Sequence, residues 1–163
     1  MDFWGQFAKE KGLIYSAYGD ISKEVGVMFH QGHNRAVSHF VEGNFRGISV
    51  KIFNYHFQIG HGKYTVRHHY TVFEFTFAGS FPHMYLNRIN NNYGLRTGEP
   101  IPVPSEFEKR FKLYAPKEYE IEALEIFTPD IFSALLEDDL RHDIELVDRE
   151  LIIFREGEIY TTE

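Results

Sequence analysis

The sequence predicts an α+β fold: a largely antiparallel, twisted β-sheet with a short helix near the N-terminus and another helix after Pro129. The chain has 16 Phe and 10 Tyr, which gather in segments of alternating apolar and polar residues, as half-buried strands do. Turn-forming glycines separate those segments at hairpin spacing. Because aromatic residues occupy both faces of the predicted strands, we expect both faces of the sheet to be covered.

The N-terminal segment FWGQFAKEK predicts a helix over residues 3–11 that ends at Gly12. Phe3, Trp4 and Phe7 fall on one side of this helix. Such a side can cover the protein's own sheet. Alternatively, it can dock in a membrane interface, where Trp and Phe favour insertion.

Residues 36–59 predict a hairpin that turns at Arg46-Gly47. Its apolar positions fix a register in which Glu42 faces Lys51 as a cross-strand ion pair.

The GHG turn at residues 60–62 then returns the chain as a strand over residues 63–77. After Pro82, residues 83–89 predict another strand.

A long polar loop, residues 90–104, interrupts the pattern with glycines and three prolines. Loops of this length usually have a function, so Asn92, Tyr93 and Arg96 are the candidate binding residues, together with an exposed sheet face or edge. We expect residues 1–163 to form a single domain, in which this loop is the candidate boundary between two lobes.

The last third mixes element types. Residues 107–115 predict a strand edge, and residues 118–127 a helical or extended link. The Thr128-Pro129 pair is typical of a helix start, with a hydroxyl cap followed by proline in the first turn. Residues 144–154 predict a closing hairpin.

Charge is unevenly distributed along the chain. Residues 1–103 carry 10 Lys and Arg against 7 Asp and Glu, whereas residues 104–163 carry 7 against 17. Without a concentrated basic face, nucleic acid is not an expected partner. The absence of cysteine excludes disulfides, thiolate catalysis and cysteine-ligated metal centres. No run of about 18 apolar residues and no signal-peptide pattern occurs, so we expect a cytoplasmic protein.

Four histidines lie in and around the second turn. A turn centred on His61 would place Asn54 between His39 and His68, with His56 two residues further along. Converging imidazoles can bind zinc or another divalent metal, so His39, His56 and His68 are the candidate ligands. The alternatives are a pH-sensitive polar network and ordinary packing among aromatic rings.

The chain contains no recognisable phosphate-binding, dinucleotide-binding, HExxH or GxSxG motif. No catalytic residues are therefore predicted, and no cofactor other than the metal of the histidine hypothesis.

Residues 29–55, 70–77, 81–86 and 107–137 together resemble an uncharacterised bacterial family of unknown function, whose members often carry membrane-spanning segments ahead of this domain. Asn54 stands where the family usually has aspartate, and Phe127-Thr128 replaces a leucine-rich approach to the proline. The resemblance implies no activity. It rests on matching positions at Phe29, Gly32, His33, Arg35, Gly43, Gly47, Val50, Phe53, Tyr55, Pro82, Phe107, Phe111 and Pro129.

These patterns favour a non-catalytic binding or scaffolding module, with a protein partner or self-association. A histidine-based metal-dependent enzyme and a peripheral membrane protein are the alternatives.

Overall fold

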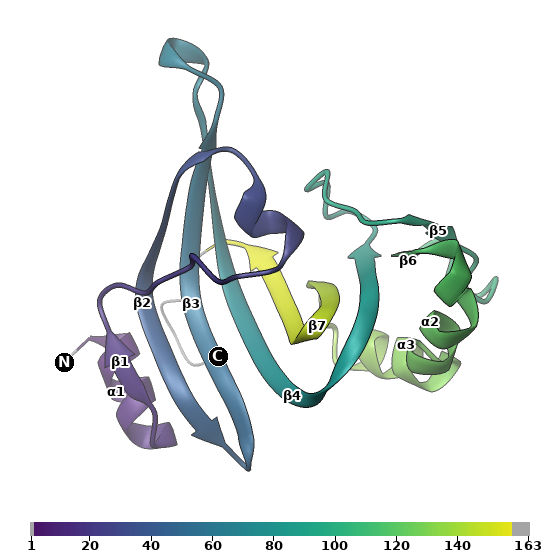
Figure 1. Cartoon of the computed structure of the whole chain (residues 1–163), viewed down its shortest axis with the longest axis horizontal. Helices are drawn as coiled ribbons and strands as arrows, with labels where there is room; N and C mark the ends of the chain where they lie inside the picture. Colours follow the sequence, from purple (N-terminus) through teal and green to yellow (C-terminus); the bar gives the residue numbers. More distant parts are fainter. Residues whose placement is uncertain (1, 158–163) are drawn as a thin grey trace.

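The computed structural model describes residues 2–157 and shows one large, strongly curved antiparallel sheet with helices at its margins (Figure 1). The predicted α+β class, with its short N-terminal helix and a helix after Pro129, is confirmed. The sheet has seven strands in the order β1-β2-β3-β4-β6-β5, with β7 paired to β4. In chain order the elements are α1 (Phe3–Lys11), β1 (Ile14–Ser16), the 3-10 helix η1 (Val27–His30), β2 (His33–Phe45), β3 (Ile48–Ile59), η2 (Gly62–Tyr64), β4 (Val66–Arg88), β5 (Glu99–Ile101), β6 (Phe111–Ala115), η3 (Lys117–Tyr119), α2 (Glu120–Ile126), α3 (Pro129–Glu137) and β7 (Asp143–Glu156).

Both predicted helix boundaries follow from local chemistry. Asp2 accepts a hydrogen bond from the backbone of Gly5 at the start of α1, and Gly12 ends α1 with a φ of 69° that glycine adopts without strain. Thr128 caps α3 by accepting from the backbone N–H of Ile131. Residues 118–127, left open between helix and extended link, form η3 and α2.

Strand β4 is 23 residues long and bends through the middle of the fold. It was predicted as two strands separated at Pro82, and that prediction was wrong. Pro82 lies where the pairing of β4 with β7 is irregular, a position at which the missing N–H of proline is tolerated. One edge of β4 pairs first with β3 and then with β6, while β7 follows the other edge.

The hairpin predicted within residues 144–154 is also absent: β7 is one continuous strand. Asp148 has a φ of 53° and faces Phe81 at the irregular part of the ladder. The left-handed residue therefore bends β7 to follow β4 instead of reversing the chain.

Near its turn the β2–β3 hairpin has the predicted register, with Glu42 opposite Lys51. Further along, an irregularity between Ser38 and Val41 shifts the ladder, so Asn54 pairs with Ser38 and not with His39 as predicted. The next register was predicted wrongly. Asn54 pairs with Thr71 instead of His68, because the return after Ile59 runs through η2 and is longer than a tight turn.

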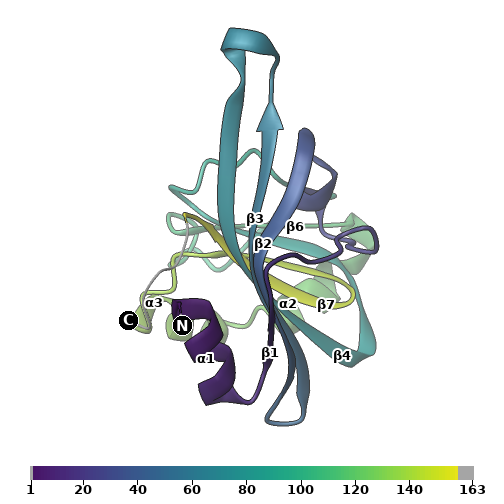
Figure 2. The same ribbon diagram turned by 90° about the vertical axis from the view of Figure 1, so that its left-hand side faces the viewer.

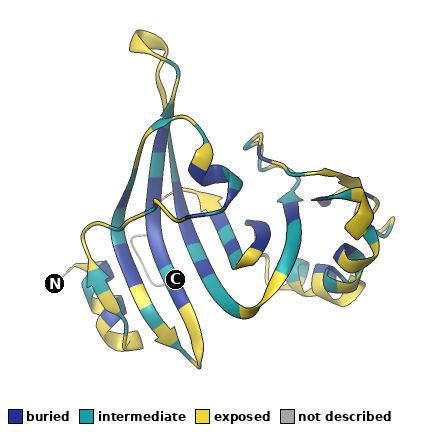
Figure 3. Cartoon of the chain, in the orientation of Figure 1, coloured by how far each residue is buried: buried dark blue, intermediate teal, exposed yellow. Residues whose placement is uncertain are grey.

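Three hydrophobic clusters pack against the sheet, and Figure 3 shows that buried residues run along its central strands. One lies where η1 and the 90–104 loop cover β3, β4 and β7. A second joins α2 and α3 to β6 and the far half of β4. The third lies beneath α1, where Trp4 is only 3% exposed. Both faces of the central strands are thus covered, as expected, and α1 covers its own sheet.

Candidate functional site

The three histidines of the metal hypothesis do not form the predicted row. His39 lies at a bulge of β2, where its ring stacks on Trp4 and its Nδ1 lies 2.9 Å from the hydroxyl of Tyr15. His56 pairs with His69, and His68 pairs with Phe57. Successive side chains point to opposite faces of a strand, so His56 and His68 are separated by the sheet.

Across residues 2–157, no group of three or more His, Asp and Glu side chains is placed to hold a metal ion. The longer turn explains the difference, because it shifts the β3–β4 pairing and moves His68 to the other face. Its ring stacks on Phe57 with centroids 5.2 Å apart, the packing among aromatics that was the alternative.

The 90–104 loop is anchored to the sheet at several points. The ring of Tyr93 packs edge-on against Tyr70, and its hydroxyl accepts a hydrogen bond of 2.8 Å from the backbone N–H of Glu156. Of the three candidate binding residues, Tyr93 is thus turned inward, while Asn92 and Arg96 are exposed.

Asp143 organises the start of this loop from a fully buried position on β7. Its carboxylate accepts hydrogen bonds from the Tyr85 hydroxyl at 2.5 Å, the Arg88 backbone at 2.9 Å, and the side chains of Asn91 at 3.0 Å and Asn87 at 3.1 Å. Burial raises the pKa of Asp143, and these donors act against that rise. With every lone-pair direction occupied, this carboxylate has a structural role.

Glu145 is a second buried carboxylate that links separate elements through hydrogen bonds. It accepts from the backbone N–H of Val27, at 3.0 and 3.1 Å, and is hydrogen-bonded to His83 Nε2. Nδ1 of His83 lies 3.2 Å from the Thr97 hydroxyl, so η1, β4 and the loop are linked. A hydroxyl, an imidazole and a carboxylate in line are also the parts of a nucleophilic catalyst. The hydrogen bonds of this row hold η1, β4 and the loop together.

Glu24 and Glu74 form a buried acidic pair beside Lys51. Nζ of Lys51 donates to Glu24 at 3.5 Å. The ion pair predicted between Lys51 and Glu42 is therefore replaced by one with Glu24, although Glu42 is opposite Lys51 in the ladder. Glu74 is 2% exposed, and burial, followed by the neighbouring Glu24, raises its pKa to about 10. The Glu74 side chain is therefore neutral at physiological pH.

An apolar cavity of about 240 Å³ lies between α1 and the sheet. The cavity has almost no polar group that could orient a ligand. Its lining residues are Phe7, Lys11, Leu13, Phe45, Val50, Ile52 and Phe75.

The most outward feature is the tip of the β3–β4 hairpin, residues 58–67, here called the hairpin arm. Its tip projects beyond the other elements in both views (Figures 1 and 2), while the ring of His61 stacks on His33 of β2 with centroids 5.1 Å apart. Ile59, Tyr64 and Val66 are 48%, 75% and 55% exposed, respectively. The sequence predicted a hairpin here, but its projection could not be inferred from a local pattern.

The fold and these sites define an α+β protein built on one curved antiparallel sheet, in which the buried Asp143 and Glu145 are hydrogen-bonded to neighbouring elements. No family model matches the sequence, and no curated protein is detectably similar to it. The fold is similar to the crystal structure of the mycobacterial trehalose monomycolate transport factor A, TtfA, with a TM-score of 0.66 and 13% sequence identity. The match covers 94% of this chain and 79% of that chain. None of the helices within residues 2–157 is long and apolar enough to cross a membrane.

Proposed function

We propose that this chain is a non-catalytic binding module that acts with a protein partner, and that the hairpin arm is its main contact. The observation that carries the proposal is the projection of the arm, with its exposed Ile59, Tyr64 and Val66. These side chains contribute little to the protein's own core, and apolar groups held in water favour burial against another surface.

The charge of the arm indicates the kind of surface it fits. No Asp or Glu occurs from residue 43 to residue 73, whereas the arm carries Lys63, Arg67 and His61. Nζ of Lys63 lies 5.3 Å from the ring centre of Tyr64, which combines cation and aromatic in one contact. The partner surface should therefore be acidic at its rim and apolar at its centre.

The 90–104 loop supplies a second contact region. Asn92 and Arg96 are exposed on it, and Tyr93 fixes it against Tyr70 of the strand that continues into the arm. The likeness of fold agrees with an accessory role, because the similar structure is named as a transport factor.

Photo-crosslinking tests the proposal. The photoreactive residue p-benzoylphenylalanine is placed at position 64 of the arm or at position 121 of α2, where Ile121 is similarly exposed at 72%. We expect a specific crosslinked protein from position 64 alone. After purification, that protein should bind the wild-type chain and lose at least about tenfold in affinity when Lys63 and Arg67 are changed to Glu, since like charges then meet across the interface.

Equal crosslinking from both positions would contradict the proposal. So would a purified candidate whose binding is indifferent to the charge reversal. A crosslink to a second copy of this chain would identify the acidic partner surface as its own, with the same charge-reversal test applied to self-association.

A further inference from the structure

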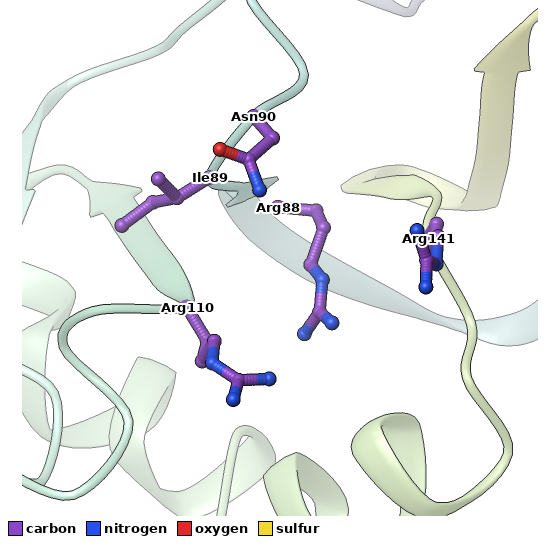
Figure 4. A pocket seen from close by; sticks show the side chains of 5 residues that line it. All are labelled: Arg88, Ile89, Asn90, Arg110 and Arg141. Carbon is purple, nitrogen blue, oxygen red and sulfur yellow. The ribbon is translucent and has the colours of Figure 1, made fainter.

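A small hollow at the foot of the 90–104 loop is lined by three arginines from three distant parts of the chain. Its volume is about 200 Å³, and Arg88, Ile89, Asn90, Arg110 and Arg141 line it. Figure 4 shows the guanidinium groups of Arg88 and Arg110 directed toward the same space, with Arg141 on the other side of Arg88.

The backbones that carry these arginines are fixed by hydrogen bonds. Arg88 donates its backbone N–H to Asp143, and its guanidinium lies over the ring of Phe111, 4.9 Å from the ring centre. The backbone N–H of Ile89 donates to the carbonyl of Arg110 at 2.8 Å. The Asn91 side chain donates to the carbonyl of Arg141 at 2.8 Å.

The hollow has a surplus of positive charge. Nη1 of Arg88 is buried and has no hydrogen-bond partner in the protein. Desolvation lowers the pKa of Arg88, and the neighbouring Arg110 and Arg141 lower it further. The opposing acid is Asp139, which accepts from Nε of Arg141 at 3.0 Å. Asp139 acts on Arg88 and Arg141, and among the described residues the hollow itself is lined by three arginines and no acidic residue.

Backbone strain is found at the same place. Asn90 has a φ of 97°, in the left-handed half of conformational space that residues other than glycine rarely occupy. Such strain persists where the surrounding contacts impose it, and it gathers at binding sites.

We propose that this hollow binds the phosphate group of a small solute, either free phosphate or a phosphate monoester. Guanidinium groups match phosphate oxygens through paired hydrogen bonds, and a phosphate has enough oxygens to engage several arginines at once. Since one water occupies about 30 Å³ of liquid, the hollow has room for a phosphate and several attached atoms. This site is separate from the hairpin arm, so it does not depend on the partner contact proposed above.

Isothermal titration calorimetry with inorganic phosphate and with glycerol 3-phosphate tests the proposal, at fixed sodium chloride concentration. We expect saturable one-to-one binding to the wild type. Arg88→Gln and Arg110→Gln should each weaken it at least about tenfold, because each removes charge-assisted hydrogen bonds.

Arg46→Gln is the matched control. Arg46 also lies over a phenylalanine, 5.1 Å from the ring centre of Phe45, and its loss changes the net charge equally. Arg110 is exposed, so Arg110→Gln keeps the test valid if Arg88→Gln unfolds.

Equal weakening by Arg46→Gln would show general electrostatic attraction and overturn the site, as would no binding of either solute. Binding to vesicles that contain phosphatidic acid, without binding of the two solutes, would overturn the small-solute assignment. Failure of the crosslinking experiment would leave this result unaffected, because the variants and the ligand are different.

Discussion

Glu74 carries a carboxyl group into the middle of the sheet, where its Oε2 has no hydrogen-bond partner. Burial raises its pKa from 4.5 to about 10. The folded protein therefore holds a proton that the unfolded chain releases, and the free energy of unfolding should fall as the pH rises through that window.

Glu74→Gln should remove this pH dependence. We expect the variant to gain up to about 5 kcal/mol in the free energy of unfolding at pH 8 and little at pH 4, because a neutral amide has no proton to lose. Urea denaturation at a series of pH values measures this difference. The control is Glu42→Gln, which changes an exposed carboxylate on β2. Parallel pH profiles for Glu74→Gln and the wild type would contradict the assignment.

At the scale of single residues, the sequence predicts what depends on near neighbours. The turn at Arg46-Gly47 determined the pairing of Glu42 with Lys51, and the Thr128 cap determined the start of α3. The sequence does not predict the buried hydrogen-bonding role of Asp143, whose donors all come from residues 85–91. Long-range pairing brings these groups together, and no spacing in the sequence records it.

Trp4 is the largest buried side chain of helix α1; it packs on the sheet and stacks on His39 with ring centres 5.7 Å apart. Trp4→Ala should lower the free energy of unfolding by roughly 3–5 kcal/mol, since the cavity left behind cannot fully close. Urea denaturation followed by circular dichroism measures the loss. Lys9→Ala, on the exposed side of the same helix, is the control and should change stability by less than about 0.5 kcal/mol.

Trp4 is also the single tryptophan of the chain, so its fluorescence reports on α1 alone. We expect the emission of the native protein to stay unchanged when vesicles are added, because the indole is already buried. A vesicle-dependent blue shift would instead support docking of Phe3, Trp4 and Phe7 in a membrane interface.

At the scale of helices and strands, the points at which strands end were harder to predict from the sequence than the strands themselves. Pro82 and Asp148 carry the sequence signals of a break and a turn, yet each lies at the irregular stretch where β4 and β7 bend together. A bulge and a turn use the same residue types, and only the presence of a partner strand decides between them.

At the scale of the whole molecule, two of the hydrophobic clusters are connected by the same two strands. Both β4 and β7 supply residues to the cluster under η1 and to the cluster under α2 and α3. We therefore predict one cooperative unfolding transition for the entire chain, although the sequence offered the 90–104 loop as a lobe boundary.

Two local probes measure this cooperativity. Trp4 reports on α1, and a fluorophore on Glu122→Cys reports on α2, since the chain has no other cysteine. The two urea midpoints should coincide. Separate midpoints would show that the part carrying α2 and α3 unfolds as an independent lobe.

The length of β4 also has a mechanical consequence. The ladder hydrogen bonds of antiparallel strands run perpendicular to the strands. A partner that pulled on the hairpin arm along its axis would therefore load the bonds of β3 to β2 and of β4 to β7 in shear, so that many would have to break together. The arm is exposed, but β4 connects it to the rest of the sheet. A force on its tip would therefore be transmitted to the body of the molecule and would not separate the two strands of the hairpin.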